Sequence, residues 1–414
     1  MGTQELLLQC AREFLRAPEF RPVFTNREQE TLRPFFTSPD GRAYFVHSLP
    51  ETVTDVLVSM FSRIKNSRGL RGVFVDSFLP LFLASTLPEV ERIFGGETEK
   101  FIRFYGVDSL EKFAAQSEDS RHALKRFQDA IRIDPEYITE FSSAPKIKKF
   151  LTTNLDRYGH NSIARVAKLT LCLENISILA AKSVEWGRMG AGYIELSTRY
   201  VDMSGKDLYP TWQELAWLGV DPERVRETME HSFRVYRSLQ EEKFSGMFPE
   251  FLRTYYKDFR DAKGFETGVV GETCDVLGNF LPCATLTSLG VAMSGEAFPE
   301  LLKHLILDET PENAAIVELI AEEAKKIGGD QFIRHFEPSE WKKASWEYLD
   351  STNYRLFPPF TAPYPSQITR ALLPPNEYVK YVLYEGFRKQ PYFANTHDFN
   401  AAMKKLKEIP RGEF

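Results

Sequence analysis

The chain has 414 residues, more than one hydrophobic core usually organises, so its length favours two domains or one core with a large extension. With 43% hydrophobic and 27% charged residues, the composition is that of a soluble globular protein. The formal net charge of −6 argues against wholesale nucleic-acid binding, because such binding needs a basic face that displaces counterions from phosphates.

The pattern of apolar residues predicts strands separated by long helices, the arrangement of an α/β or α+β protein. We expect Asn175 or Ser177 to cap the helix that follows a strand near 166–173. In chain order the sequence predicts a helix over 51–66, a buried strand within 72–85, helices between 108 and 157, a turn at 156–162, a strand over 166–173, a helix to about 186, an extended segment over 193–201, a long helix over 221–258, a strand near 284–292, and helices from about 296 and over 311–327.

Cysteine usage and hydropathy indicate the compartment. Cys10, Cys172, Cys274 and Cys283 form no CxxC pair, which suits a reducing cytoplasm better than a disulfide scaffold. No apolar run reaches the roughly 18–20 residues of a membrane span. The amphipathic stretch near the N-terminus carries charges that a secretory signal lacks. We therefore expect a cytoplasmic protein without a membrane partner. No pattern typical of a catalytic nucleophile or a metal site stands out.

The stretch from Tyr193 to Tyr200 carries the most chemical information. In an extended chain alternate side chains share a face, so Glu195, Ser197 and Arg199 are expected to point the same way, within about 14 Å at roughly 3.4 Å per residue. This face suits an anionic nucleotide, because Arg forks onto phosphate oxygens, Ser donates, and Glu accepts from a sugar or base. The alternative is a solvated edge strand with an internal Glu–Arg pair.

These residues resemble the flavin-dependent thymidylate synthase family, whose members have a Gly-His-x-Ser turn, a strand, a helix ending in Arg-His-Arg, and a Tyr/Phe-Asn-Glu-x-Ser-x-Arg-Tyr segment. Residues 159–162 match the turn, and residues 193–200 match the segment with Ile194 in place of Asn. The resemblance covers about 155–325. It implies the thymidylate synthase complementing protein fold, a twisted and mainly antiparallel sheet with long helices, here with a helical N-terminal extension.

The resemblance also implies a division of the chain. We expect a mostly helical N-terminal region over 1–150, a family-like domain over 151–335, and a C-terminal extension over 336–414. The N-terminal region is interpreted as a degenerate repeat, because residues 49–65 and 173–188 share an acidic and polar start, an apolar helix and a basic end. The alternative is that two amphipathic helices look similar by chance.

In this family reduced FAD, with NADPH and methylene-tetrahydrofolate as co-substrates, supports the methylation of dUMP to dTMP without a protein nucleophile. The residues that the motifs assign are Glu195, Ser197 and Arg199 for the uridine nucleotide, and His160, Ser162 and Arg188 near the flavin. His160 has an alternative role as a turn cap. Arg188 has an alternative role as a cation at a helix C-terminus.

Several positions depart from the family pattern. The Arg-His-Arg triplet falls on Gly187-Arg188-Met189, Arg165 stands where the turn motif continues to Glu, and Gly278 stands where the family has Arg. The family's Asn-x-Arg becomes Ser294-Gly295-Glu296. A charge-assisted hydrogen bond to phosphate is worth roughly 1.5–3 kcal/mol. Losing two or three of them, with repulsion from Glu296, predicts that the chain does not carry a complete site of its own.

A missing arginine can come from another chain, because this family builds its sites at subunit interfaces. We therefore expect a homo-oligomer or a complex with a second family member. Longer members join a degenerate copy like this one to a copy that carries Arg-His-Arg. The alternative function is that of an inactive homologue, a structural or regulatory subunit of an active partner. A related activity on another pyrimidine is a further possibility.

A basic cluster at 63–71 is the remaining candidate for phosphate binding. It consists of Arg63, Lys65, Arg68 and Arg71, on or just after the first predicted helix. It is interpreted either as a contact to nucleotide or flavin phosphate, or as a solvated helix end. An RNA-binding role for the same cluster conflicts with the acidic net charge.

Overall fold

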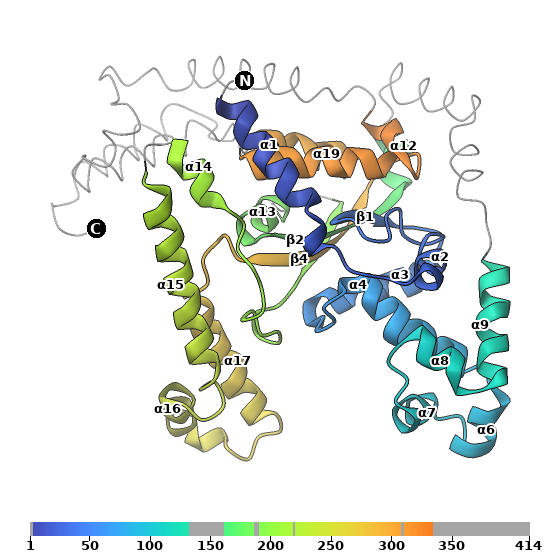
Figure 1. Cartoon of the computed structure of the whole chain (residues 1–414). Coiled ribbons are helices and arrows are strands. Elements are labelled where there is room, and N and C mark those ends of the chain that lie inside the picture. The colour runs from blue at the N-terminus through green and yellow to red at the C-terminus, as the bar shows by residue number, and fades with distance from the viewer. Residues whose placement is uncertain (1–2, 132–160, 186–189, 218–219, 308–309, 334–414) are drawn as a thin grey trace, which may run out of the picture. The chain divides into compact units, whose positions relative to one another are not determined.

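A computed structural model describes residues 3–131, 161–185, 190–217, 220–307 and 310–333 (Figure 1). The chain divides into two compact units. The first unit consists of Met1–Thr211 with Arg226–Arg334, and the second consists of Trp212–Val225 with His335–Phe414. The sheet and the motif segment both belong to the first unit.

A four-stranded antiparallel sheet organises the first unit, with the strand order β1-β2-β4-β3. Figure 1 labels three of these strands, β1, β2 and β4. Its inner strands, β2 and β4, pair along almost their whole lengths, and most of their side chains are buried. The sequence located both of them, β2 from a partly alternating run of leucines and β4 as a strand near 284–292. The expected α/β class is confirmed. The strands are β1 (Ala43–Val46), β2 (Lys168–Ser177), β3 (Ala191–Glu195) and β4 (Leu286–Ser294).

The N-terminal region contributes an edge strand to this sheet. All four residues of β1 are buried, and Tyr44 lies opposite Cys172 of β2. The N-terminal helix α1 (Thr3–Arg16) lies beside α19 (Pro311–Lys325) (Figure 1). Arg12 forms an ion pair of 2.6 Å with Glu318. The two ends of the described chain are therefore held together within one unit.

Helices make up most of the remaining described structure. They are α1 (Thr3–Arg16), η1 (Pro18–Phe20), α2 (Asn26–Leu32), α3 (Glu51–Ser59), η2 (Met60–Arg63), α4 (Gly69–Val73), η3 (Phe74–Phe78), α5 (Leu79–Ala84), α6 (Pro88–Phe94), α7 (Thr98–Tyr105), α8 (Leu110–Gln116), α9 (Glu118–Ala130), α12 (Asn161–Val166), α13 (Ile178–Val184), α14 (Thr211–Trp217), α15 (Pro222–Gln240), α16 (Met247–Tyr255), η5 (Lys257–Phe259), α17 (Phe265–Gly278), α18 (Ala297–Leu307), α19 (Pro311–Lys325) and η6 (Gly329–Phe332).

Two predicted elements outside the motif segment are wrong. The apolar run at 72–85 is helical rather than a strand, because Val75, Leu79 and Leu83 recur at four-residue spacing and are buried together in the core. The helix predicted over 221–258 is two helices, α15 and α16. The chain turns between them at Gly246, where an added Cβ would lie 2.6 Å from Glu242 Cβ.

The larger described core packs N-terminal helices against the sheet. It is rich in phenylalanine, and it includes Phe36, Phe61, Phe74 and Phe101 together with Cys172 of β2. Among the described helices none is by itself long and apolar enough to cross a membrane. One bent pair, residues 69–84 with 88–94, meets the length and composition limits only when both helices are counted.

Candidate functional site

The motif segment begins as strand β3 and ends as a turn. Glu195, the last residue of β3, lies opposite Leu289 of β4. The carbonyl of Ser197 then accepts hydrogen bonds from the amides of Tyr200 and Val201, at 3.1 and 3.0 Å. The extended segment predicted to reach Val201 is therefore wrong after Glu195, and strand alternation does not place Glu195 and Arg199 on a common face.

A small apolar cluster explains why the chain turns there. Leu196 and Val201 are both buried, and they share this cluster with side chains of α15 and α17. A straight strand would carry Val201 away from these neighbours. Burial of two aliphatic side chains contributes roughly 1.5–3 kcal/mol each. The turn exposes the charged residue between them, Arg199, whose side chain is 57% accessible.

Glu195 lies against a lysine from the preceding helix. Lys182 of α13 donates to Glu195 at 2.5 Å and to Glu185 at 2.7 Å. Ser177 caps α13 as expected, because its side chain accepts from the amide of Ala180. Burial lowers the pKa of Lys182, but the hydrogen bonds to the two carboxylates outweigh it and raise the pKa overall. The lysine is therefore charged at neutral pH, and it neutralises the half-buried Glu195.

Arg199 is paired in the same manner. Its Nε donates to Asp275 Oδ1 at 2.7 Å, and its Nη2 lies 2.6 Å from Asp275 Oδ2, a bidentate arrangement. Asp275 comes from α17, and its hydrogen bond raises the pKa of Arg199. Both partners are exposed, so a ligand phosphate can exchange with Asp275 without breaking a buried interaction. No pattern in the sequence indicated Asp275 or Lys182 as neighbours of the motif.

Ser197 connects the motif to the N-terminal region. Its amide donates to the carbonyl of Ser62 in η2, at 3.2 Å. The next residue of η2, Arg63, places its guanidinium 4.6 Å from the centre of the Tyr200 ring. Residues of η2, which precede the motif segment by more than a hundred positions in the sequence, therefore contact it on one side.

The expected flavin residues are only partly placed. His160 and Arg188 lie outside the described residues. Ser162 belongs to the short helix α12, and only its backbone is described. The helix is joined to the end of β4, because the amide of Gly295 donates to the carbonyl of Ala167 at 3.0 Å.

Two departures from the family pattern lie together here. Arg165 of α12 forms a bidentate ion pair with Glu296 just after β4, with Nη2 donating to Oε1 at 3.0 Å. The two positions have exchanged charge signs relative to the family pattern, with Arg in place of Glu and Glu in place of Arg. The sequence predicted that Glu296 would repel a phosphate. This prediction is corrected, because Arg165 compensates the negative charge of Glu296.

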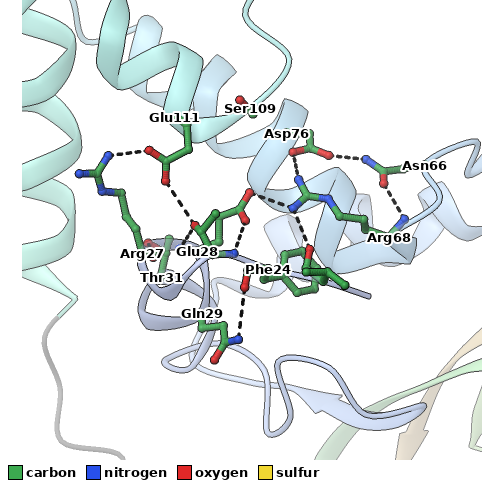
Figure 2. A network of polar contacts seen from close by, with 12 residues as sticks. Phe24, Arg27, Glu28, Gln29, Thr31, Asn66, Arg68, Asp76, Ser109 and Glu111 are labelled. Atoms are coloured by element: carbon green, nitrogen blue, oxygen red, sulfur yellow. Dashed lines mark hydrogen bonds and ion pairs between the residues drawn. The ribbon is translucent and has the colours of Figure 1, made fainter. Parts of the chain in front are cut away.

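Arg68 belongs to an internal network (Figure 2). It donates to Glu28 at 2.9 Å, pairs with Asp76 and stacks on the ring of Phe24, while Asn66 donates to Asp76 at 2.6 Å. Its guanidinium is therefore committed to holding α2 against the α4 region. The interpretation of this residue as a solvated helix end is wrong, and its two carboxylate partners argue against a phosphate contact.

Arg71 is buried completely. It donates to Glu174 Oε2 at 2.9 Å and to the carbonyls of Ser38 and Gly41, and its guanidinium lies 4.0 Å from the centre of the Tyr44 ring. A buried charge needs such a set of partners to offset desolvation. Arg71 is therefore structural, and only Arg63 and Lys65 of the basic cluster remain exposed.

A large apolar cavity lies apart from the motif. It has a volume of about 760 Å³ and is formed by the N-terminal helices. Its apolar lining includes Phe35, Leu49, Val53, Phe74, Phe78, Leu79, Leu81, Phe82 and Phe127. The charged residues in its described lining are Glu97 and Glu99. Such a surface does not suit an anionic nucleotide.

Comparison with known proteins gives a family. The family model described as "Thymidylate synthase complementing protein" matches residues 108–327, just over half of the chain. A UPF0159 protein of Chlamydia pneumoniae is 25% identical over 68% of this chain and 44% of its own length. A UPF0159 protein of Chlamydia muridarum is 25% identical over 76% of this chain and 50% of its own length. A UPF0159 protein of Thermoplasma acidophilum is 28% identical over 41% of this chain and 38% of its own length. The chain spans about half the length of the curated relatives it matches.

Proposed function

The chain belongs to the thymidylate synthase complementing protein family, and from that premise we propose that it binds a uridine nucleotide and takes part in FAD-dependent formation of dTMP from dUMP. Methylene-tetrahydrofolate would supply the carbon, and NADPH would reduce the flavin. We further propose that it acts in the cytoplasm, as a homo-oligomer or with a second family member. The observation that carries the proposal is the motif turn, which presents Arg199 at the surface in an exposed pair with Asp275.

The motif residues would bind and orient the nucleotide. Arg199 would exchange its exposed carboxylate partner, Asp275, for a phosphate of greater charge. Glu195, which accepts a hydrogen bond from Lys182, would also accept from the sugar or base. Ser197 would donate through its hydroxyl. This is an arrangement of binding groups, as expected where the cofactor supplies the chemistry.

The flavin, when bound, would supply the electrons that convert the transferred carbon to a methyl group. His160, Ser162 and Arg188 are proposed to lie near it. The described residues fit an anionic cofactor at one further point. Glu296 engages Nε and Nη2 of Arg165, which leaves the Nη1 donors of this exposed guanidinium available to a phosphate.

A second function is supported by the same ion pairs. Both charged motif residues, Glu195 and Arg199, are neutralised within the chain by Lys182 and Asp275, so neither needs a ligand as its counterion. At the three Arg-His-Arg positions the sequence has Gly187-Arg188-Met189, so Arg188 is the one basic residue left there. These observations favour a catalytically inactive homologue that serves as the structural or regulatory subunit of an active partner.

A flavin titration separates the two functions. The purified chain is titrated with FAD and then with dUMP, while the flavin absorbance band is recorded. An active site predicts a bound flavin whose spectrum shifts when dUMP is added, and Arg199→Ala should abolish the shift. Arg27→Ala is the matched control, because Arg27 forms an exposed pair with Glu111 in the N-terminal region. No flavin binding at saturating FAD would reject the autonomous enzyme and favour the subunit.

A further inference from the structure

We propose that Arg63, from the N-terminal region, is a further nucleotide-binding residue whose guanidinium binds the phosphate of the nucleotide at the motif turn. This inference rests on the proposed function and adds a residue that the family motifs do not contain. It assigns a role to η2, which otherwise serves only to pack against the sheet.

The state of the Arg63 side chain is the first observation. It is exposed, it lies over the Tyr200 ring at 4.6 Å, and within the described part of the chain no carboxylate pairs with it. Arg68 and Arg71 of the same cluster are compensated by carboxylates. Stacking on an aromatic ring orients a guanidinium while leaving its N–H edge able to donate. Arg63 is thus an oriented cation with unused donors beside the motif.

The attachment of η2 to the motif is the second observation. The Ser62 carbonyl accepts from the Ser197 amide, and Ile64 packs against the apolar cluster that contains Leu196. Phe61, also in η2, packs against Gly290 of β4, where an added Cβ would lie 2.9 Å from the Phe61 ring. Contacts on both sides of Arg63 therefore fix its backbone relative to the motif turn.

The position of a missing arginine is the third observation. Gly278, at the end of α17, is the position that the resemblance aligns with an Arg of the family. A Cβ built on Gly278 would have Thr198 Oγ1, in the motif turn, as its nearest neighbour at 3.9 Å. Position 278 therefore faces the same turn that Arg63 covers through Tyr200. We infer that Arg63 replaces the positive charge that the family places at position 278.

The charges explain why a second cation is needed. Arg199 is shared with Asp275, so this pair contributes little net positive charge to a ligand. A nucleotide monophosphate carries close to two negative charges and is usually held by several charge-assisted hydrogen bonds. Arg63 supplies an uncompensated positive charge next to the motif. A nucleoside without phosphate has no group for it to bind.

The test compares dUMP with deoxyuridine, using calorimetric titration of the full chain in the presence of FAD. Arg63→Ala should weaken dUMP binding by about tenfold to a hundredfold, the range for one charge-assisted contact, and should leave deoxyuridine binding unchanged. Lys65→Ala, which removes the other exposed cation of the cluster, is the matched control and should change neither. Gly278→Arg in the Arg63→Ala background should restore dUMP affinity, since that position has space and no positive φ.

The outcomes separate this inference from the function on which it rests. If the unmodified chain binds dUMP and Arg63→Ala binds it equally well, the role of Arg63 is rejected while the proposed function stands. Equal losses for dUMP and deoxyuridine would also reject a phosphate contact. If the unmodified chain binds neither compound, the proposed function fails and the assignment of Arg63 fails with it.

Discussion

The buried pair of Arg71 and Glu174 offers a direct measure of how the N-terminal region is joined to the sheet. Glu174, on β2, accepts from Arg71, from the hydroxyl of Tyr44 at 2.9 Å and from the amide of Leu70 at 2.8 Å. Glu174→Gln keeps the shape of the side chain but removes the charge. It leaves the guanidinium of Arg71, which is 0% exposed, without its counterion. Removing one partner of a buried pair costs about 3–5 kcal/mol, a large part of a typical domain stability of about 5–15 kcal/mol.

Equilibrium unfolding in urea, followed by far-ultraviolet circular dichroism, measures this loss. Glu111→Gln is the control, because the pair of Glu111 and Arg27 is 45% and 47% exposed and such pairs contribute about 0–1 kcal/mol after screening by solvent. If Glu174→Gln and Glu111→Gln lose the same free energy of unfolding, the buried pair does not stabilise the fold and the argument is refuted. The urea dependence must stay unchanged for the comparison to hold.

Three other sites give predictions of their own. Burial lowers the pKa of His47 from its ordinary 6.5 to about 4, so between these pH values the unfolded chain binds a proton that the folded chain does not. The free energy of unfolding should therefore fall by up to about 3 kcal/mol as pH drops from about 6.5 to about 4. Urea titrations at successive pH values measure this slope, which His47→Gln should flatten. Asp275→Asn releases Arg199 and should tighten dUMP binding by up to about fivefold in calorimetry, whereas unchanged or weaker binding would contradict the competition between carboxylate and phosphate. Arg165→Glu should lower the melting temperature and the FAD affinity, and adding Glu296→Arg should recover both; a double variant no better than the single one would show that the exchanged charges do not act as a pair.

The sequence identified the parts of the fold that depend on local pattern. Both inner strands were predicted near their observed positions, and Ser177 caps α13 as expected. The sequence missed β1, because four residues are too short for a periodic signal and their partner, β2, is more than a hundred residues away. The strand expected within 72–85 failed for a related reason, since a continuous apolar run does not distinguish a buried strand from a buried helix.

The sequence predicted the residues of the motif itself, but it did not predict which residues from other elements contact them. Glu195, Ser197 and Arg199 were found because they are close in sequence. Their partners Lys182 and Asp275 come from two different helices, and Asp275 is 76 positions from Arg199. No local pattern indicates such a contact. The turn after Glu195 was missed because it depends on apolar neighbours in α15 and α17 that local periodicity does not reveal.

The distribution of compensated charges separates structural from functional cations in this chain. Arg71 is buried with its carboxylate, and the partly exposed Arg68 has two carboxylate partners and an aromatic ring, so a ligand would have to break a network that also holds the fold. Arg199 has one exposed partner, which a phosphate can displace at little cost to stability. Arg63 has an aromatic ring alone among its described contacts. A phosphate would therefore break fewer existing interactions to bind Arg199 or Arg63 than to bind Arg68 or Arg71. A ligand with two negative charges is thus expected to bind most strongly next to Tyr200, near Arg63 and Arg199.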